Sequence, residues 1–500
     1  MSTQDVLDQA VSALGGREAL DAAVTETITA TGWRRHPGWG TEPHKPEAVA
    51  EFAFTLVDEI GGPRYKLSLS AQTHLVPTEL DYTEIGNGST GHVKGIDFMF
   101  DPRPVDMAIP AWRVATRVRH FDLTSPLRLV RAMLVPGADV EANGHILTLR
   151  QAGRPDTHVH VDPRTGLPVR VETVEEHTPL GDATVAVLFE DYRRSGTVVV
   201  PFEVTITVDD VPVHQETRSG ITVASTVLDD EFAVPEAEPV EASAAQMAFS
   251  QFSAEWILTY VYSGVRFYFD LQTKPLSDGP LDIAPGVKIV IGPSHNTLVV
   301  EMPDHTLAVE SPLYGDYTSE ALKQVKEAFP GKPLTEFVGT HFHYDHIGGI
   351  REFASNGGLT VYVGEPTAAF FENIFTRPYT VHPDTYATKP EPVTVKPVTD
   401  PVILPTADGG TLQIHRITSD HSDDMMIVYL STAKIVFESD LWNPTPSMPR
   451  SGDQRGRLAT QLYQEIVRLG LDVETVVGGH SGPDQTHAAP LAYLKTAAGL

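Results

Sequence analysis

One short run constrains this chain more than any other: residues 340–349 read THFHYDHIGG. Three histidines and an aspartate within six residues add desolvation and like-charge costs that a bound cation would offset. Imidazole nitrogens and carboxylate oxygens are ligands for zinc and neighbouring transition metals. On an extended backbone His341 and His343 point to the same side, and Asp345 and His346 can serve a second ion from the following turn. The run therefore predicts a two-metal site.

Further candidate ligands lie at the ends of apolar, strand-like segments. His421 comes just before one such segment, and Asp440 and His480 follow two others. Strand-end loops are where enzymes built on sheets commonly place their chemistry. Asp420 is either a partner for a metal-bound imidazole or a simple turn carboxylate. For His295 a structural role is favoured over a functional one.

The order of these motifs resembles the metallo-β-lactamase superfamily over about residues 250–500, half of the chain. The resemblance implies an αββα sandwich with a hydrolytic centre of two divalent ions, with zinc first and manganese or iron as alternatives. Carried over residue by residue, it implies that His341, His343 and His421 hold one ion, that Asp345, His346 and His480 hold the other, and that Asp440 bridges them. The chain has no cysteine, which excludes the β-lactamases that carry Cys at the bridging position. The flavodiiron branch is disfavoured, because it carries Glu where His343 stands.

The implied chemistry is attack by a hydroxide held between the two ions. Asp345 would orient this hydroxide and pass its proton to the leaving group, and Tyr344 would either donate to an oxyanion or only pack. We expect a hydrolase of an ester, lactone or related bond in a neutral, fairly apolar small molecule. The alternatives are a sulfate or phosphate ester hydrolase, a mononuclear iron dioxygenase of the persulfide-oxidising type, and a ligand-binding protein with a vestigial metal site.

A second H-x-H-x-D pattern, at residues 158–162, favours a structural interpretation. It lacks the following histidine and the glycine pair, and residues 162–166 form an ordinary turn sequence. Alternation of His158 and His160 with valines is typical of a strand with one polar face. We therefore expect no metal at this second pattern.

The formal net charge of −29 argues against nucleic acid as a partner, because phosphate binding needs clustered Lys and Arg. No stretch reaches the roughly 18 apolar residues of a membrane span, and the N-terminus does not resemble a secretory signal. We expect a cytoplasmic protein, or an exported one if a leader was removed. The expected partner is a small-molecule substrate, and a homo-oligomer is possible.

Five hundred residues predict two domains, with a Pro- and Glu-rich boundary near residues 235–248. We expect a mainly antiparallel β accessory domain at 1–240, for substrate capture or dimerisation, and a catalytic domain at 241–500. The first half also resembles the sheet domain that precedes the metal domain in some bacterial members of the superfamily. Its expected elements are helices at 5–14 and 18–23 and short strands at 184–188, 197–199 and 203–208.

Aromatic residues recur at helical spacing after the boundary, at Phe249, Phe252, Trp256 and Tyr260, and continue at 267–269. Such a stripe is typical of core packing, and the alternative is the wall of an apolar substrate pocket.

The rest of the second half predicts two mixed sheets between helices. The expected strands are 287–291, 297–301, 306–310 and 334–339, and the expected helices are 319–329 and 457–469. Residues 376–405 and 443–452 are expected to be irregular loops beside the ligands, with Arg377 and His382 as possible substrate contacts.

Overall fold

The structure is a computed structural model that describes residues 2–74, 78–100, 103–226, 229–238, 240–263, 278–292, 294–313, 316–444, 452–481 and 487–500. The chain forms two compact units. The first unit comprises Met1–His36, Ala48–His177 and Asp182–Phe267, and the second comprises Pro37–Glu47, Thr178–Gly181 and Tyr268–Leu500. Two short segments from early in the sequence thus belong to the second unit.

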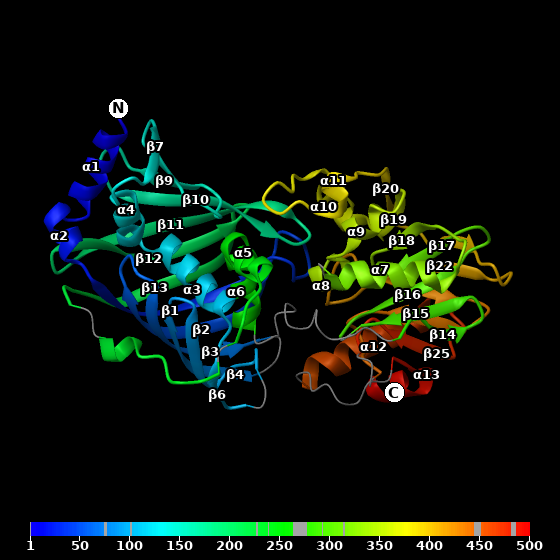
Figure 1. The fold of residues 1–500 in the computed structure, drawn as a ribbon. Coiled ribbons are helices and arrows are strands. Elements are labelled where there is room, and N and C mark those ends of the chain that lie inside the picture. Colours follow the sequence, from blue (N-terminus) through cyan, green and yellow to red (C-terminus); the bar gives the residue numbers. More distant parts are fainter. Residues whose placement is uncertain are drawn as a thin grey trace. The chain divides into compact units, whose positions relative to one another are not determined.

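The first unit is built on one antiparallel sheet, which has 13 strands in the described part of the chain (Figure 1). The strand order is β6-β5-β4-β3-β2-β1-β13-β12-β11-β10-β9-β8-β7, so β1 pairs with β13 and each other neighbour follows in sequence. The strands are β1 (Thr25–His36), β2 (Glu47–Glu59), β3 (Arg64–Thr73), β4 (Thr78–Asn87), β5 (Thr90–Ile96), β6 (Val105–Ala108), β7 (Asp139–Asn143), β8 (Ile146–Arg150), β9 (Thr157–Val161), β10 (Pro168–His177), β11 (Gly181–Ser195), β12 (Val198–Val208) and β13 (Val211–Ala224). The expected antiparallel sheet is confirmed.

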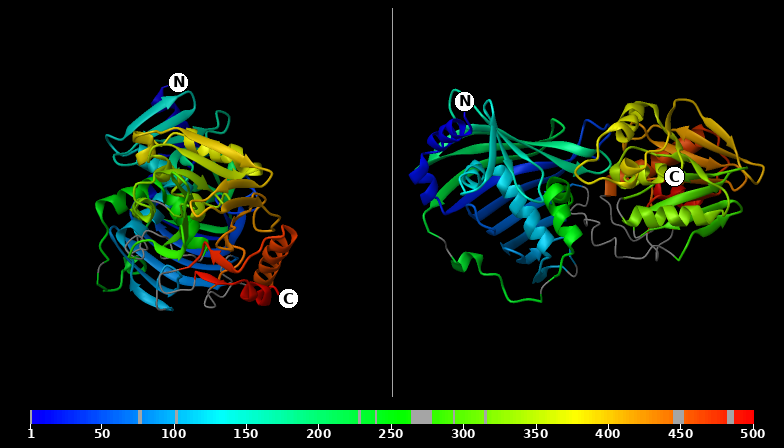
Figure 2. Two further views of the ribbon diagram at one scale, coloured as in Figure 1. Left: turned by 90° about the vertical axis from the view of Figure 1, so that its right-hand side faces the viewer. Right: turned by 45° about the horizontal axis from the view of Figure 1, so that its top comes forward.

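Helices pack on this sheet and bury its apolar face. They are α1 (Thr3–Ala13), α2 (Arg17–Ala22), α3 (Ala111–Thr124), α4 (Pro126–Met133), the 3₁₀ turn η1 (Asp229–Phe232), α5 (Ala244–Phe252) and α6 (Ala254–Ser263). Figures 1 and 2 show α3, α5 and α6 lying against the strands. Ser2 starts α1 through a reciprocal capping box with Asp5, which satisfies two backbone N–H groups that have no partner within the helix.

The structure corrects one expectation in this unit. The strands expected at 197–199 and 203–208 form one strand, β12, which runs through Pro201. Proline is tolerated there because β13 pairs with β12 only from Glu203 onward, so the missing N–H breaks no hydrogen bond to that neighbour.

The aromatic stripe lies in α5 and α6 and packs inside the first unit. Phe249 contacts Trp256 edge to face, and Trp256 contacts Tyr260 in the same way. Core packing is therefore the observed role of these rings. The expected continuation of the stripe at 267–269 lies outside the described residues.

The second unit contains two mixed sheets that pack face to face (Figure 1). One has the order β14 (Leu281–Ala284), β15 (Val287–Ile291), β16 (Asn296–Glu301), β17 (Thr306–Val309), β18 (Leu334–Val338), β19 (Leu359–Gly364) and β20 (Val393–Val398). The other has the order β21 (Val402–Pro405), β22 (Thr411–Arg416), β23 (Met426–Leu430), β24 (Ile435–Glu438), β25 (Thr475–Gly478) and β26 (Ala488–Pro490). Buried side chains of both sheets, such as Leu298 and Phe437, form one core between them.

Helices accompany both sheets of the second unit. They are α7 (Asp316–Ala328), α8 (Tyr344–Ile347), α9 (Ile350–Ala354), the 3₁₀ turn η3 (Glu365–Thr367), α10 (Ala368–Thr376), α11 (Thr385–Thr388), α12 (Gly452–Arg468) and α13 (Leu491–Ala497). The expectation that 376–405 is irregular is wrong in part, because α11, β20 and β21 fall within it. Val393–Val398 forms β20 because it pairs in parallel with β19. The backbone hydrogen bonds come from this neighbour, and the sequence of the segment alone does not predict the pairing.

Within the described residues, no helix is long and apolar enough to span a membrane.

Candidate metal centre

The predicted ligands come from loops at strand ends, as expected for a site built on sheets. His341 and His343 follow β18, and Asp345 and His346 lie in the one-turn helix α8. The remaining predicted ligands lie between β22 and β23 (His421), after β24 (Asp440) and after β25 (His480). The structure brings all seven side chains together.

Two groups of four side chains could each hold an ion. The first ligand group is His341, His343, His421 and Asp440, and the second ligand group is His295, Asp345, His346 and His480. Within each group, the candidate ligand atoms lie within 4.8 Å of one another. His295, for which the sequence favoured a structural role, thus joins the second ligand group.

Asp440 contacts members of both ligand groups. Its Oδ2 lies 3.0 Å from His421 Nε2 and 3.1 Å from His346 Nε2, and its Oδ1 lies 2.5 Å from His480 Nε2. Asp440 also adopts a left-handed backbone (φ +65°), which a non-glycine residue rarely occupies without a reason. This geometry places the Asp440 carboxylate between the two ligand groups.

The residues fit a metal ion in two respects. Among the described residues, the buried Nε2 atoms of His341 and His421 make no well-aligned hydrogen bond, although Asp440 Oδ2 lies 3.4 and 3.0 Å from them, and a bound ion would satisfy both nitrogens. Burial also lowers the pKa of His341 to about 3, with His346 adding repulsion, so the ring is neutral as a ligand must be. Burial raises the pKa of Asp440, but the nearby His346 and His480 outweigh it and hold that pKa well below its usual value.

Glu310 orients two of these rings, and sequence reasoning missed it. Its Oε2 lies 3.0 Å from His346 Nδ1, and its Oε1 accepts a 2.6 Å hydrogen bond from Thr340, whose hydroxyl lies 3.0 Å from His341 Nδ1. Such carboxylate–histidine pairs fix the ring of a metal ligand and raise its basicity. The available signal was a buried carboxylate directly after the apolar strand β17, the same pattern that revealed Asp440.

His346 lies between two carboxylates. Burial lowers its pKa, but Glu310 and Asp440 outweigh burial and raise that pKa well above the usual value. The ring therefore carries a proton at Nε2, which faces Asp440 at 3.1 Å. A divalent ion bound at Nε2 would replace this proton, which is the usual competition between metal and proton at a histidine.

Glu438 holds the turn that carries Asp440. Its Oε2 accepts hydrogen bonds of 3.1 Å from the backbone N–H groups of Leu441 and Trp442. Ser439 contributes from the same turn, since its Oγ lies 3.0 Å from His346 Nδ1. The left-handed backbone of Asp440 is thus supported on both sides.

His295 is held against Asp345. Its Nε2 lies 3.2 Å from Asp345 Oδ2, and its Nδ1 lies 2.7 Å from Ser294 Oγ. An isolated bridge pairs His295 with His480, and their ring centroids are 4.1 Å apart. His295 can therefore act as a ligand or as a donor that orients Asp345.

Other predicted residues have different surroundings. The ring of Tyr344 stacks with that of Phe370 at 6.4 Å, an arrangement that supplies packing and leaves its catalytic role a prediction. Asp420 pairs with Arg457 at 2.9 Å rather than with an imidazole, which favours the turn-carboxylate interpretation. Arg377 and His382 are not members of either ligand group.

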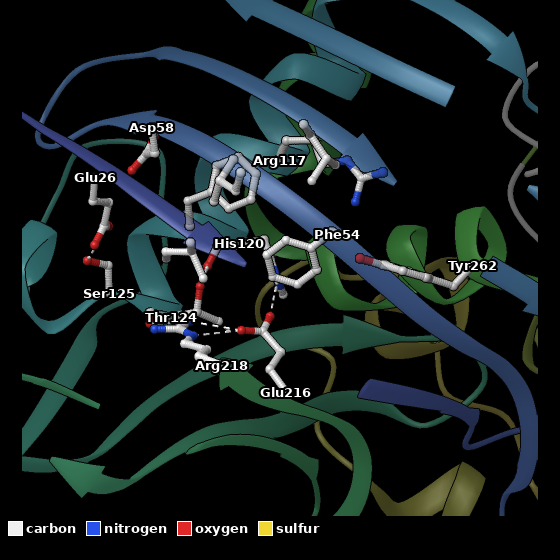
Figure 3. Close-up of a pocket in the computed structure, with 14 residues that line it drawn as sticks. Glu26, Phe54, Asp58, Arg117, His120, Thr124, Ser125, Glu216, Arg218 and Tyr262 are labelled. Atoms are coloured by element: carbon white, nitrogen blue, oxygen red, sulfur yellow. Dashed lines mark hydrogen bonds and ion pairs between the residues drawn. The ribbon is translucent and has the colours of Figure 1, made fainter. Parts of the chain in front are cut away.

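A third buried cluster, His120, His214 and Glu216, lies in the first unit. Figure 3 shows His120 and Glu216 beside the adjoining cavity. Arg218 pairs with Glu216 at 2.9 Å. Arg34 donates to His214 Nδ1 at 3.4 Å, so His214 Nε2 carries the proton and faces Glu216 at 3.1 Å. The adjoining cavity of about 20 Å³ has room for about one water molecule. Arginines in contact with the candidate ligands disfavour a divalent cation, so we interpret this cluster as a buried ion-pair network.

The rejected H-x-H pattern forms the predicted strand, β9, in which Val159 and Val161 are buried. His158 Nδ1 lies 2.9 Å from Thr148 Oγ1, and His160 Nε2 lies 2.9 Å from Glu172 Oε2. Each imidazole therefore has its own partner on a neighbouring strand.

Comparison with known families identifies part of the second unit. Residues 312–480 match the model described as Metallo-beta-lactamase superfamily. This part of the chain belongs to that superfamily. The metallo-β-lactamase domain includes all the predicted ligands, from His341 to His480. None of the curated proteins with which the chain was compared matches it.

Several solved structures are similar to this chain. A metallo-β-lactamase from Pontibacter korlensis is 20% identical, with 45% of this chain and 98% of that chain covered and a TM-score of 0.34. A metallo-β-lactamase from Hirschia baltica is 17% identical, with 45% and 97% covered and a TM-score of 0.32. A double mutant of the sec-alkyl sulfatase PisA1 is 18% identical, with 44% and 41% covered and a TM-score of 0.32.

Proposed function

We propose that the metallo-β-lactamase domain is a dinuclear metal-dependent hydrolase. The observation that carries the proposal is the pair of four-residue ligand groups with Asp440 in contact with members of both. A single-iron oxygenase would use one such group and would leave the second without a role. We therefore favour two divalent ions, zinc first, with manganese or iron as alternatives.

The ions, when bound, supply a hydroxide at neutral pH and polarise the substrate oxygen. The protein's own part is to hold the ligands. Glu310 and Thr340 fix the rings of His346 and His341. Burial raises the pKa of Asp345, but His346 and His295 outweigh it and hold that pKa well below its usual value. Asp345 is therefore ionised at neutral pH and available as the predicted proton carrier to the leaving group.

The proposed substrate is a neutral, fairly apolar small molecule with an ester, lactone or related bond. The net charge of −29 disfavours polyanionic substrates through long-range repulsion. Aromatic rings are close to the ligands: the buried Phe342 contacts His343 at 4.9 Å between centroids, and Phe370 contacts Phe342 at 5.7 Å. Sulfate and phosphate esters are the alternative substrate class.

Metal-loaded protein should be assayed against esters, lactones, phosphodiesters, sulfate esters and β-lactams, with chelator-treated protein as the control. We expect hydrolysis of an ester or lactone that is lost on chelation and returns with zinc. One iron per chain with thiol-dependent oxygen uptake would contradict the hydrolase proposal. No turnover together with tight ligand binding would favour the binding-protein alternative.

A further inference from the structure

Residues 37–47 begin with the sequence PGWG and lead into β2. Their position in the sequence and their position in the fold differ. In sequence they connect β1 to β2 of the first unit, yet Pro37–Glu47 belongs to the second compact unit. We call this segment the 37–47 strap. It lies about three hundred residues before the ligands in sequence.

The strap contacts two predicted metal ligands through hydrogen bonds. The indole Nε1–H of Trp39 donates to Asp345 Oδ1 at 3.0 Å. The carbonyl oxygen of Gly40 lies 2.8 Å from His343 Nε2, whereas the Gly40 N–H lies 3.2 Å from the same nitrogen. The shorter contact requires a proton on Nε2, so we assign that tautomer to His343.

Each contact leaves a defined ligand atom for an ion. With Nε2 of His343 donating to Gly40, the lone pair of Nδ1 is left for an ion, and the His343 ring lies 4.5 Å from that of His341 and 4.6 Å from that of His421 between centroids. With Oδ1 of Asp345 accepting from Trp39, Oδ2 is the oxygen that lies near His295 (3.2 Å) and His346 (3.6 Å) of the second ligand group. The strap thus orients one ligand of each group.

Glycines at positions 38 and 40 allow the strap to lie close to the loop that carries the ligands. A Cβ on Gly38 would lie 2.3 Å from Cγ of the Tyr344 ring, so only glycine permits the contact. Gly40 has φ +138°, a conformation that side chains rarely adopt. Trp39 is 7% exposed, so its indole is held in place by its surroundings.

Further backbone bonds tie the strap down. The carbonyl of Trp39 accepts from Glu47 N at 2.8 Å, and that of Thr41 accepts from Asp423 N at 3.0 Å. Asp423 lies two residues after the ligand His421. The strap therefore reaches the loops of His343, Asp345 and His421.

We propose that the 37–47 strap is a structural part of the metal centre, with Trp39 and Gly40 as positioning residues for Asp345 and His343. The proposal rests on the proposed two-metal site. It implies that residues 241–500 carry every ligand but not the groups that orient two of them. Metal affinity, rather than folding of the sheets, is the property that the strap controls.

The test compares Trp39→Phe with Trp33→Phe in the full-length chain. Trp33 is a matched control, because its Nε1–H donates to Gln215 Oε1 at 2.7 Å within the first unit. Zinc affinity is measured by chelator competition, and the cobalt(II)-loaded proteins are compared by their visible absorption spectra. We expect Trp39→Phe to weaken the binding of one ion by about 10–100-fold, as loss of an orienting partner does, and to alter the cobalt spectrum. Trp33→Phe should change neither.

Gly38→Ala provides a second variant, because its methyl group would push the strap away from Tyr344. Gly220→Ala is its control, since a Cβ there meets nothing within 4 Å. Affinities and spectra equal to wild type in both strap variants, with two ions bound, would overturn the inference and leave the proposed function standing. A wild-type chain that binds no metal would overturn both.

Discussion

Among the described residues, histidines and carboxylates cluster in both compact units, and the surroundings of the clusters differ between the units. In the first unit the carboxylates Glu216 and Glu255 pair with Arg218 and Arg34, both at 2.9 Å. In the second unit the ion pairs of Asp345 and Asp440 run to histidines. In each group of both units the candidate ligand atoms lie within 4.8 Å of one another.

The groups around a cluster, rather than its residue types, therefore indicate whether it suits a metal ion. Arginine supplies the positive charge that buried carboxylates need, so a further divalent cation would meet repulsion. Where only imidazoles surround the carboxylates, the positive charge must come from protons or from ions. Arginines already balance the carboxylates of the first-unit cluster, whereas the carboxylates of the candidate metal centre need cations or protonated imidazoles for balance.

The largest expected effect is that of Asp440→Ala. Removing a carboxylate in contact with both ligand groups should cost at least one ion. It should also lower turnover by more than roughly 100-fold, which is the upper limit for residues that only orient a metal ligand. Metal content by elemental analysis and activity on the best substrate of the panel are the measurements. Asp420→Ala, which loses only a surface pair with Arg457, is the control. Full activity with two ions retained would show that Asp440 is not the bridge.

Among substitutions in the first-unit cluster, Arg34→Met should lower the free energy of unfolding most. It leaves the fully buried Glu255 without its 2.9 Å partner, and breaking a buried pair costs about 3–5 kcal/mol. Denaturant unfolding of the first unit measures this loss, and metal content should stay at two ions. The exposed pair of Arg17 and Asp21 is the control, because Arg17→Met should cost at most about 1 kcal/mol. Equal costs for the two variants would contradict the network interpretation.

The pH dependence of stability offers a finer comparison. Burial lowers the pKa of His214 from 6.5 to about 4, so between these values the folded chain holds fewer protons than the unfolded chain. The stability from this neutral ring is complete above pH 6.5 and is lost as the pH falls toward 4. We expect His214→Gln to flatten the fall in unfolding free energy over that window. An unchanged slope would mean that His214 does not titrate as assigned.

His158→Ala should have the smallest effect. Its imidazole has a single neutral partner, Thr148, and is half-buried, so we expect a loss of about 1 kcal/mol or less. Metal content should be unchanged, as elemental analysis would report. Loss of an ion from this variant would show that the second H-x-H pattern does bind metal.

The candidate ligands could be picked out from the sequence because each stands beside a local pattern. His341 to His346 form a dense run, and Asp440 and His480 each follow an apolar strand. The mixed sheets and the antiparallel first half were also predictable, since alternation and turn residues are local signals. The resemblance to the superfamily then supplied the partition of the ligands.

What could not be predicted depends on tertiary contacts. Trp39 reaches Asp345 from a loop three hundred residues earlier, and no local period encodes that contact. Glu310 had the pattern of a strand-end carboxylate, but its role depends on the close approach of Thr340 and His346. Helices α5 and α6 pack with the first unit, where Leu258 and Tyr262 of α6 join its core and α5 contacts α3 and β10, and the aromatic spacing alone did not specify these contacts.

Counting zinc ions by equilibrium dialysis tests the central claim most directly. We expect two tightly bound ions per wild-type chain and two in the His214→Gln variant, because the proposed site for both ions is in the metallo-β-lactamase domain. One ion or none in the wild type, or a count that falls when His214 is replaced, would contradict it.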